Sequence, residues 1–430
     1  MKQILKLAVP NILTNLSVPL LSSVDTAVVG HLDKISYLGA IAIGSMIFNF
    51  IYWGFGFLRM GTTGMTAIGF GKNDSTETAS ISGRAMFIAI AAGILLIILR
   101  TPINDLSFYL VNASPEVEKY ASQYFYIRIF AAPATLAIYV FHGWFLGMQN
   151  AKYPLILLVT VNTLNILFNL LFIYQFGMKS DGVAWGTLVA QYSGLLLAIF
   201  LYLKKYSSQL SFFKFESIFH IEELKRFFKI NTDIFFRTLA LIFTLSFFTA
   251  ESAQFGDNVL AANTILLQLW IFLSYAVDGF AFAGESLVGK YKGRKNRAAL
   301  KTVVKKLFMS GFIIAIFFTL VYLLGEEQIL YLFTNDKAVV ELAVTYFLWT
   351  ALTPVINSIS FLWDGIYIGA TATAPMRNTM IFSAVFIFLP TYYLFKDSIG
   401  NEALWLAMVL FMVARAIGLT LTSKKYIFNT

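Results

Sequence analysis

The chain has 430 residues, of which 58% are hydrophobic and only 13% are charged, and its mean hydropathy is +0.73. A soluble globular domain carries roughly 25% charged residues. This composition therefore excludes an ordinary soluble protein and predicts an integral membrane protein. The formal net charge is +9 and cysteine is absent, which excludes a disulfide, a thiolate nucleophile and a thiolate metal site.

Taken in chain order, twelve apolar segments are long enough to cross a bilayer as helices. A helix needs roughly 20 residues to cross about 30 Å of hydrocarbon. The segments of this length lie near residues 7–30, 38–70, 85–104, 120–147, 154–175, 182–203, 230–252, 258–288, 304–325, 340–368, 375–395 and 402–422. The first has a short basic head and no small-residue cleavage site, so we expect a retained helix and not a removed signal peptide.

The basic residues are concentrated in alternate connectors. If both termini are cytoplasmic, 22 of the 32 lysine and arginine residues fall in cytoplasmic segments, six in outer segments and four within the spans. Such an excess sets the orientation of membrane proteins, so we expect a multi-pass protein of the cytoplasmic membrane with both ends in the cytoplasm. The excess then faces the anionic inner leaflet, and the net charge requires no nucleic-acid partner.

The longest connector, residues 204–229, is basic and amphipathic and lies at the middle of the chain. Such a pattern is typical of a helix that lies in the membrane interface, although a regulatory or calmodulin-like segment has the same pattern. We expect a cytoplasmic interfacial linker between an N-terminal lobe at 1–203, with helices one to six, and a C-terminal lobe at 230–430, with helices seven to twelve.

The two halves repeat one another with an offset of about 220 residues. The matches, in order, are GMTAIG at 64–69 with GESLVG at 284–289, YFYIRIFAAP at 124–133 with YFLWTALTP at 346–354, GWFLGMQNAKYP at 143–154 with GIYIGATATAP at 365–375, and GVAW at 182–185 with EALW at 402–405. Ordered matches at a nearly constant offset indicate an internal duplication. Since each half holds six spans, both halves enter the membrane from the same side and are related by an axis along the membrane normal.

We therefore predict an all-α membrane protein of twelve transmembrane helices in two pseudo-symmetric six-helix lobes. Transporters built from such repeats hold substrate between the lobes and expose it to one side of the membrane at a time. Channels and static scaffolds also arise by duplication, so the repeat favours transport without excluding them.

Asp25 is an acid within the first apolar segment, which has no basic residue near it. A charged side chain at the membrane centre costs roughly 2.5–3.5 kcal/mol, so a functional role is the default hypothesis. Helices five and six supply neutral oxygens, from Asn165 and Asn169 four residues apart on one face and from Thr187. One carboxylate with amide and hydroxyl oxygens suits a proton or a sodium ion. The alternative is a hydrogen-bonded cluster that only holds helices together.

A second group of candidates comprises Asp364, His142, Asp278 and Arg237. Asp364 and His142 occupy equivalent positions in the two repeats, each one residue before a Gly-x-x-x-Gly pair. These glycines allow close helix packing, while Asp364 and His142 are candidates to face a substrate cleft. Asp278 and Arg237 lie on neighbouring segments of the second lobe and can neutralise each other.

Three further ionisable residues within the apolar segments are Arg59, Glu285 and Arg415. We expect them near helix ends, where long side chains reach the interface or pair with a partner.

The residues of an intramembrane enzyme are not evident. The three histidines, His31, His142 and His220, are scattered, and the sequence has no HExxH, GxSxG or Walker loop. We therefore expect no catalytic residue, no bound metal and no cofactor, apart from a proton or sodium ion as the coupling ion.

Several segments occur in the order typical of one transporter family. They are VDTAVVGHL at 24–32, LGAIAIG at 38–44, GMTAIGFGKND at 64–74, NILFNLLFIYQFGMKSDGVAWGTLVAQ at 165–191, DIFFRTLAL at 233–241, LAANTILLQLW at 260–270, VDGFAFAGESLVGKYKGRKN at 277–296 and WDGIYIGATATAPMRN at 363–378. With this ordered set, the chain resembles the multidrug and toxic compound extrusion (MATE) family, especially its DinF-like branch, over nearly its whole length.

The resemblance implies export of a substrate in exchange for inward protons or sodium ions. It implies a cation site made by an acid on the first helix, an Asn on helix five and a Thr on helix six, which correspond to Asp25, Asn165 and Thr187. The family's acid on helix five is replaced by Asn169, and one fewer negative charge favours protons over sodium. The resemblance also implies a hinge at Pro10, about four turns before the acid.

Together these features predict a secondary active antiporter that exports amphipathic organic or cationic compounds in exchange for protons. We expect it to act as a monomer whose partners are a small amphipathic substrate and membrane lipid. The alternative is a flippase for a lipid-linked substrate. A flippase for polyanionic headgroups should present several basic residues to the cleft, whereas only four lie within the spans.

Overall fold

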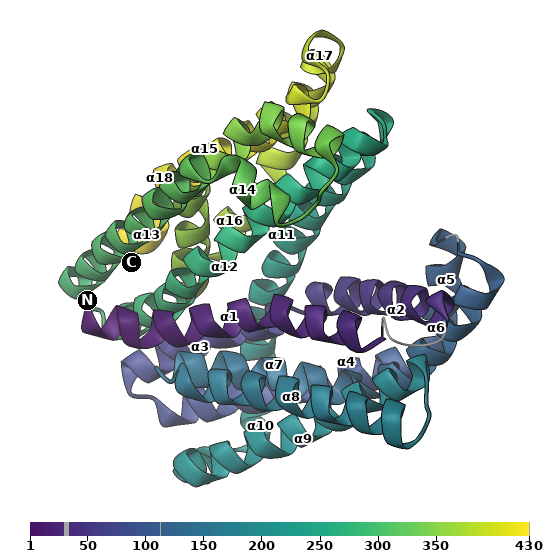
Figure 1. Cartoon of the computed structure of the whole chain (residues 1–430). Helices are drawn as coiled ribbons and strands as arrows, with labels where there is room; N and C mark the ends of the chain where they lie inside the picture. The colour runs from purple at the N-terminus through teal and green to yellow at the C-terminus, as the bar shows by residue number, and fades with distance from the viewer. Residues whose placement is uncertain (30–33, 112, 430) are drawn as a thin grey trace. The chain divides into compact units, whose positions relative to one another are not determined.

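The computed structural model describes residues 1–29, 34–111 and 113–429, with side chains for all of these except 17–29, 35 and 215. The described residues form helices joined by short turns, with no strand among them (Figure 1). Eleven helical segments within them are long and apolar enough to cross a membrane. The first predicted span, 7–30, falls on α1 and extends beyond the described residues, so the helical pattern agrees with the predicted twelve-helix fold.

Contacts divide the chain into two compact units. The first-half unit is Leu13–Phe227, and the second-half unit is Phe228–Thr430 together with Met1–Ile12. The duplication assigns the first twelve residues to the N-terminal lobe, but in the structure they group with the second half. Helix α1, Lys2–Val29, therefore contributes residues to both units.

Helices of the first-half unit follow in chain order after α1. They are α2 (Ile35–Gly54), α3 (Phe57–Lys72), α4 (Ser75–Ile98), α5 (Arg100–Leu110), α6 (Pro115–Arg128), the 3₁₀ turn η1 (Ile129–Ala131), α7 (Ala132–Gly147), α8 (Lys152–Leu170), the π-helical η2 (Leu171–Gln175), α9 (Ser180–Tyr206), η3 (Ser207–Phe212) and α10 (Phe215–Ile218).

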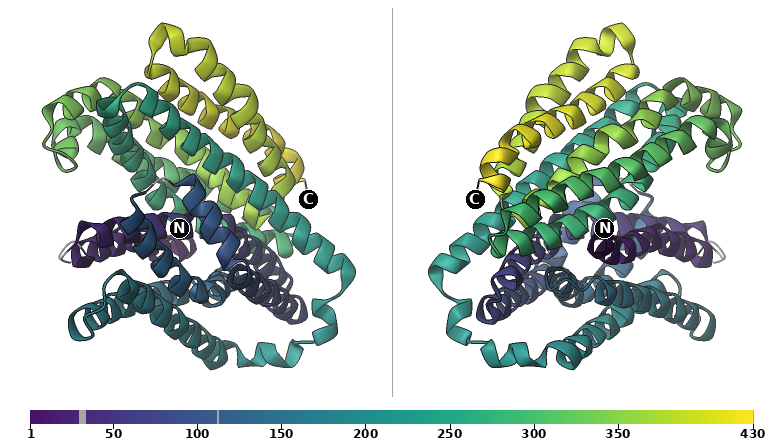
Figure 2. Two further views of the ribbon diagram at one scale, coloured as in Figure 1. Left: turned by 90° about the vertical axis from the view of Figure 1, so that its right-hand side faces the viewer. Right: turned by 90° about the vertical axis from the view of Figure 1, so that its left-hand side faces the viewer.

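Helix α11 (Ile221–Gln254) begins in the first-half unit and continues into the second. The rest of the second-half unit comprises α12 (Asp257–Gly293), α13 (Arg297–Leu324), α14 (Glu326–Tyr331), α15 (Lys337–Gly369), α16 (Thr373–Phe382), the π-helical η4 (Ser383–Phe388), α17 (Leu389–Ile399), α18 (Glu402–Ser423) and the π-helical η5 (Lys424–Phe428). Helix α15 packs against both α13 and α18 in this unit, and these three helices are drawn in green to yellow in Figure 2.

The duplication is visible in the backbone. Non-glycine residues with positive φ, which most side chains avoid, occur in pairs separated by the repeat offset. Asn73 has a φ of 57° and Lys295 one of 54°, while Gln149 has a φ of 63° and Thr371 one of 52°. Each of these residues follows a helix. Equivalent helices in the two halves therefore end with a residue in the same left-handed conformation.

The helices that follow two of these turns also begin alike. The side chain of Asp74 accepts a hydrogen bond of 2.8 Å from the backbone N–H of Glu77, and Asn296 accepts one of 3.0 Å from Ala299. Such N-caps satisfy an N–H that has no partner within the helix. The cap at Asp74 starts α4 ten residues before the predicted span at 85–104, because its first turns are polar but helical.

Paired glycines bring two helices together in the first-half unit. A methyl group at Gly143 would overlap the carbonyl oxygen of Arg59, and one at Gly147 would lie 2.6 Å from Cβ of Thr66. Helices α7 and α3 thus approach one another most closely at the two glycine positions of α7.

The same arrangement recurs in the second-half unit. A methyl group at Gly365 would overlap the carbonyl oxygen of Ala281, and one at Gly369 would overlap that of Glu285. Helices α15 and α12 repeat the packing of α7 and α3. Ala281 lies 222 residues after Arg59, and Glu285 lies 222 residues after Thr63, whose carbonyl oxygen would lie 2.9 Å from a methyl group at Gly147. The predicted packing role of both Gly-x-x-x-Gly pairs is confirmed.

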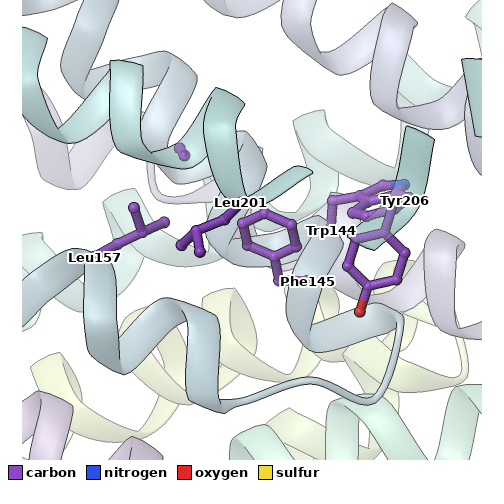
Figure 3. Close-up of a cluster of buried hydrophobic side chains, with 6 residues drawn as sticks. Trp144, Phe145, Leu157, Leu201 and Tyr206 are labelled. Atoms are coloured by element: carbon purple, nitrogen blue, oxygen red, sulfur yellow. The ribbon is translucent and has the colours of Figure 1, made fainter. Parts of the chain in front are cut away.

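A cluster of buried aromatic and aliphatic side chains joins α7, α8 and α9 in the first-half unit. Figure 3 shows the cluster, in which the rings of Trp144 and Tyr206 lie 4.9 Å apart and nearly perpendicular. The Tyr206 hydroxyl also accepts a hydrogen bond of 3.1 Å from the amide of Asn150. Buried aromatic pairs of this kind contribute about 0.5–1.5 kcal/mol beyond the area they bury.

The connector at 204–229 is largely helical and is held by a buried arginine of α4. The guanidinium group of Arg84 donates to the backbone carbonyls of Ser217 at 2.7 Å and Ile218 at 3.1 Å. The hydroxyls of Ser80 and Ser217 lie 2.7 Å apart. The connector is therefore fixed to the first-half unit by specific polar contacts.

We predict that Gly365→Ala destabilises the protein because its new methyl group has no space against the backbone of α12. Overpacking of this kind costs about 1–3 kcal/mol. Thermal unfolding of the detergent-purified chain should show a clearly lowered midpoint.

Gly284→Ala is the matched control, since its methyl group would lie 3.3 Å from the flexible end of Leu307. Equal midpoints for the two variants would contradict the close approach of α15 to α12.

Candidate functional site

Three polar residues predicted to form a cation site meet between α8 and α9. The amide nitrogen of Asn165 donates to Oγ1 of Thr187 at 3.0 Å, and the amide nitrogen of Asn169 donates to Oδ1 of Asn165 at 3.2 Å. Thr187 in turn donates to the backbone carbonyl of Val183 at 3.0 Å. The structure therefore joins Asn165, Asn169 and Thr187 in one chain of hydrogen bonds, defined here as the asparagine cluster.

The asparagine cluster is buried and tightly packed. Asn165 is 4% exposed and Asn169 only 1% exposed. A methyl group at Gly186 would overlap the side-chain oxygen of Asn169. Glycine at this position therefore lets the backbone of α9 lie directly against the cluster.

Chemically, the asparagine cluster offers neutral oxygens but no charge of its own. Amide and hydroxyl oxygens are suitable ligands for a hard cation, provided that a carboxylate compensates its charge. Asp25, the predicted carboxylate, belongs to α1, and the part of α1 from Leu13 onward groups with the same unit. The side chain of Asp25 lies outside the described residues, so its place beside the cluster stays a prediction.

A second polar centre lies within the second-half unit. One carboxylate oxygen of Asp364 on α15 pairs with Arg237 of α11 and, at 2.6 Å, with Arg415 of α18. Burial of a charge is costly unless it is paired and hydrogen-bonded, and here each charge has a partner. We call Asp364, Arg237 and Arg415 the arginine–aspartate network.

The expected pairing of Arg237 with Asp278 is wrong, because Arg237 forms its ion pair with Asp364. The same carboxylate also pairs with Arg415. The sequence places Arg237 and Asp278 on neighbouring segments, but the direction in which each helix presents its side chain decides the partner.

The expected location of Arg415 at a helix end is also wrong. Arg415 lies eight residues before the end of α18 and is 1% exposed. Glu285 is equally buried within α12. The sequence did contain a signal for this burial. Arg415 lies in an apolar segment that has no acid, so a charge there requires a partner from another helix.

A further ion pair ties α11 to α16. The carboxylate of Asp233 lies 2.5 Å from the guanidinium group of Arg377 and accepts a hydrogen bond of 2.9 Å from Thr373. Because Asp233 and Arg237 are four residues apart, they share one face of α11. This face therefore carries two successive ion pairs that sequence reasoning did not find.

One face of α15 carries further polar atoms. Thr350, Asn357 and Asp364 are seven residues apart and so lie on the same side of the helix. Within the described part of the chain, Oγ1 of Thr350, both amide atoms of Asn357 and Oδ1 of Asp364 are buried without a hydrogen-bond partner. Pro354 lacks the N–H that would reach the Thr350 carbonyl, and the Thr353 hydroxyl donates to that carbonyl at 2.7 Å. The free atoms on this face can bind water or a ligand.

His142 and Pro10 are not joined to either polar centre by a described contact. His142 lies on α7, and its Nε2 is buried without a hydrogen-bond partner among the described residues. Pro10 lies within α1, three residues before Leu13, where the part of that helix that groups with the first half begins. Whether His142 and Asp364 face a substrate remains a prediction. Among the described residues, no group of three histidine, aspartate or glutamate side chains is placed to bind a metal.

We predict that Asp364→Asn strongly destabilises the protein, since it removes the only described carboxylate that pairs with Arg237 and Arg415. Removing one member of a buried ion pair typically costs about 3–5 kcal/mol. The measurement is thermal or denaturant unfolding of the purified chain.

Asp397→Asn makes the same change at an exposed residue and should leave the unfolding midpoint nearly unchanged. If Asp364→Asn unfolds like this control, the network does not stabilise the second-half unit.

Known proteins resemble this chain over nearly its whole length. The MatE family model matches residues 10–171 and 234–394, one range in each half. DNA damage-inducible protein F of Escherichia coli (strain K12) is 36% identical over 430 residues, which cover 99% of this chain and 92% of that protein. Multidrug export protein MepA of Staphylococcus aureus (strain NCTC 8325 / PS 47) is 25% identical over 84% of this chain and 80% of its own length.

Solved structures show a similar fold. A MATE protein in the bent conformation matches with a TM-score of 0.90 at 20% identity, over 99% of this chain and 95% of that chain. The outward-facing conformation of a multidrug resistance MATE family transporter matches with a TM-score of 0.88, also at 20% identity and with the same coverage. These likenesses confirm the predicted all-α fold of two six-helix halves.

Proposed function

Because this chain belongs to the multidrug and toxic compound extrusion (MATE) family and resembles its DinF-like members, we propose that this integral, multi-pass membrane transporter is a proton-coupled antiporter. It exports amphipathic organic or cationic compounds while protons enter. Asp25 binds the coupling proton, and the asparagine cluster of Asn165, Asn169 and Thr187 forms the polar surroundings of the protonated and ionised acid.

The observation that carries this proposal is the buried asparagine cluster. An isolated carboxylate in the membrane is costly when ionised, but neighbouring amide and hydroxyl groups can hydrogen-bond both of its protonation states. The chain of bonds from Asn169 through Asn165 to Thr187 provides such groups within one unit.

Protons are favoured over sodium by the charge of the site. Asn169 is neutral at the position where the family has a second acid, so Asp25 is the one carboxylate that we assign to the site. A sodium ion would have to exchange its hydration shell for one carboxylate and neutral oxygens, whereas a proton needs only the carboxylate. Each proton that enters down 100 mV yields about 2.3 kcal/mol. Export of a monovalent cation against the same potential costs an equal amount, so a pH gradient drives one-for-one exchange of a cation, whereas the potential also drives export of a neutral compound.

The proposed substrate class follows from the composition and from similar proteins. The 43 Phe, 21 Tyr and 7 Trp residues offer ring faces to cations and apolar bodies, and MepA, a similar protein, is a multidrug export protein. The basic loops support a cytoplasmic location of both termini in the cytoplasmic membrane. We further propose a monomer without a nucleic-acid partner.

The flippase alternative is not favoured. Two of the basic residues within the spans, Arg237 and Arg415, are held by Asp364. One of these two positive charges is therefore neutralised, and the single remaining charge does not form a strongly positive surface for a polyanionic headgroup.

We predict that Asp25→Asn abolishes transport driven by a pH gradient, because Asn cannot bind and release a proton. Proteoliposomes with an imposed pH gradient should move a fluorescent organic cation with the unaltered chain and at background rate with the variant. A sodium gradient alone should drive neither protein.

The matched control is Asp74→Asn, which makes the same change at the N-cap of α4, where Asn also caps well. Undiminished transport by Asp25→Asn would remove Asp25 from the mechanism, and transport driven by sodium alone would reverse the assignment of the ion.

We also predict that Pro10→Ala slows transport several-fold without unfolding the chain. Proline removes a backbone hydrogen bond within a helix, so alanine should stiffen α1 where its residues pass from one unit to the other. Initial rates in proteoliposomes, compared with thermal stability, separate the two effects.

Pro115→Ala is the control, since Pro115 occupies the first turn of α6, where its missing N–H has no helical partner. If Pro10→Ala transports as fast as this control, bending at Pro10 is not part of the cycle.

A further inference from the structure

The second-half unit carries a pocket that the transport mechanism does not use. Its volume is about 370 Å³, and its wall includes Lys301, Lys305 and Phe308 of α13, Trp363 of α15 and Phe428 of η5. The two lysines form a polar part of the wall, and the three aromatic rings form an apolar part.

The lysines lie on one face of α13 with an aromatic residue below them. Lys301, Lys305 and Phe308 follow at spacings of four and three, which places them along one side of a helix. Both lysines are exposed. No acidic residue occurs in 289–324 or in 403–430, the segments that supply most of this wall, so the positive charge has no acid within them to compensate it.

The aromatic part of the wall is apolar although it contains a tryptophan. The indole N–H of Trp363 donates to Oγ1 of Thr420 at 2.8 Å, so it is not available to a ligand. The ring of Trp363 packs edge-on against that of Phe308 with 4.9 Å between centroids. The pocket therefore meets only the carbon surface of these rings.

The sequence of α13 places the pocket at the membrane boundary. Basic residues occur up to Lys306, and residues 307–324 contain no charge. Eighteen helical residues span roughly 27 Å at about 1.5 Å each, which is close to the hydrocarbon thickness. Lys301 and Lys305 thus lie at the level of lipid headgroups, and Phe308 lies where the hydrocarbon begins.

We propose that this pocket binds an acidic phospholipid. The lipid phosphate lies against the ammonium groups of Lys301 and Lys305, and the first part of an acyl chain lies along Phe308, Trp363 and Phe428. Basic pockets between transmembrane helices bind acidic headgroups in this way.

The lipid is favoured over a free phosphate because of the apolar wall. An inorganic ion would contact only two flexible, exposed lysines, whereas an amphiphile also buries hydrocarbon against three rings. The proposal depends on the membrane location of the chain but not on its coupling ion or substrate.

The test is native mass spectrometry of the full chain in detergent, titrated with phosphatidylglycerol or with phosphatidylcholine of the same acyl chains. We expect one phosphatidylglycerol to bind preferentially. Each lysine near a membrane surface contributes about 1 kcal/mol toward acidic lipid, so K301Q/K305Q should weaken this binding roughly 30-fold. K301R/K305R should retain it, because the charge is kept.

The matched control is K424Q/K425Q, which removes two exposed lysines of η5 that do not line the pocket. It should weaken binding less than about threefold. Phe428→Ala should weaken both lipids, since it shortens the apolar wall. Equal binding of the two lipids, equal loss in both lysine variants, or displacement of the lipid by glycerol 3-phosphate at equal concentration would overturn the proposal.

Discussion

The close approach of two helices through paired glycines is the constraint on which the rest of this structure depends. In each half, two glycines of one helix pack with their backbone directly against the neighbouring helix. These pairs are α7 with α3 and α15 with α12. Lipid tails are as apolar as the surfaces of the helices, so the hydrophobic effect does not drive one transmembrane helix against another. Close van der Waals contact is therefore a main source of helix association. Gly365 fixes the rotation of α15 against α12. The side chains of the two residues just before it therefore point toward helices other than α12. Asp364 meets Arg237 and Arg415, and Trp363 meets Phe308.

The two halves share a backbone but differ in their polar chemistry. The first-half unit carries neutral amides and a hydroxyl in the asparagine cluster, so it can accept a charge from elsewhere. The second-half unit carries the arginine–aspartate network, in which one carboxylate is shared by two guanidinium groups and joins three helices by ion pairs. The two halves thus share one architecture but differ in a few buried side chains, which form a neutral amide cluster in one half and a network of ion pairs in the other.

Much of the architecture could be predicted, but several partners could not. Eleven spans, the duplication, the role of the Gly-x-x-x-Gly pairs and the meeting of Asn165 with Thr187 all follow from local pattern or from the family resemblance. The pairing of Arg237 with Asp278 failed, because two residues on adjacent segments can point in different directions. Arg415 was expected near a helix end, where a long side chain can reach the interface, but it is buried and pairs with Asp364, which lies 51 residues away.

By itself, the sequence determined the membrane location, the number of spans and the twofold repeat, because these depend on composition, length and periodicity, which are local properties of the chain. It also determined which side chains are costly in hydrocarbon. Only the tertiary structure decided how that cost is met, since the compensation comes from helices far apart in sequence whose rotation and depth are set by packing. For the same reason, the grouping of Met1–Ile12 with the second half and the pocket beside Trp363 became visible only once the helices were packed.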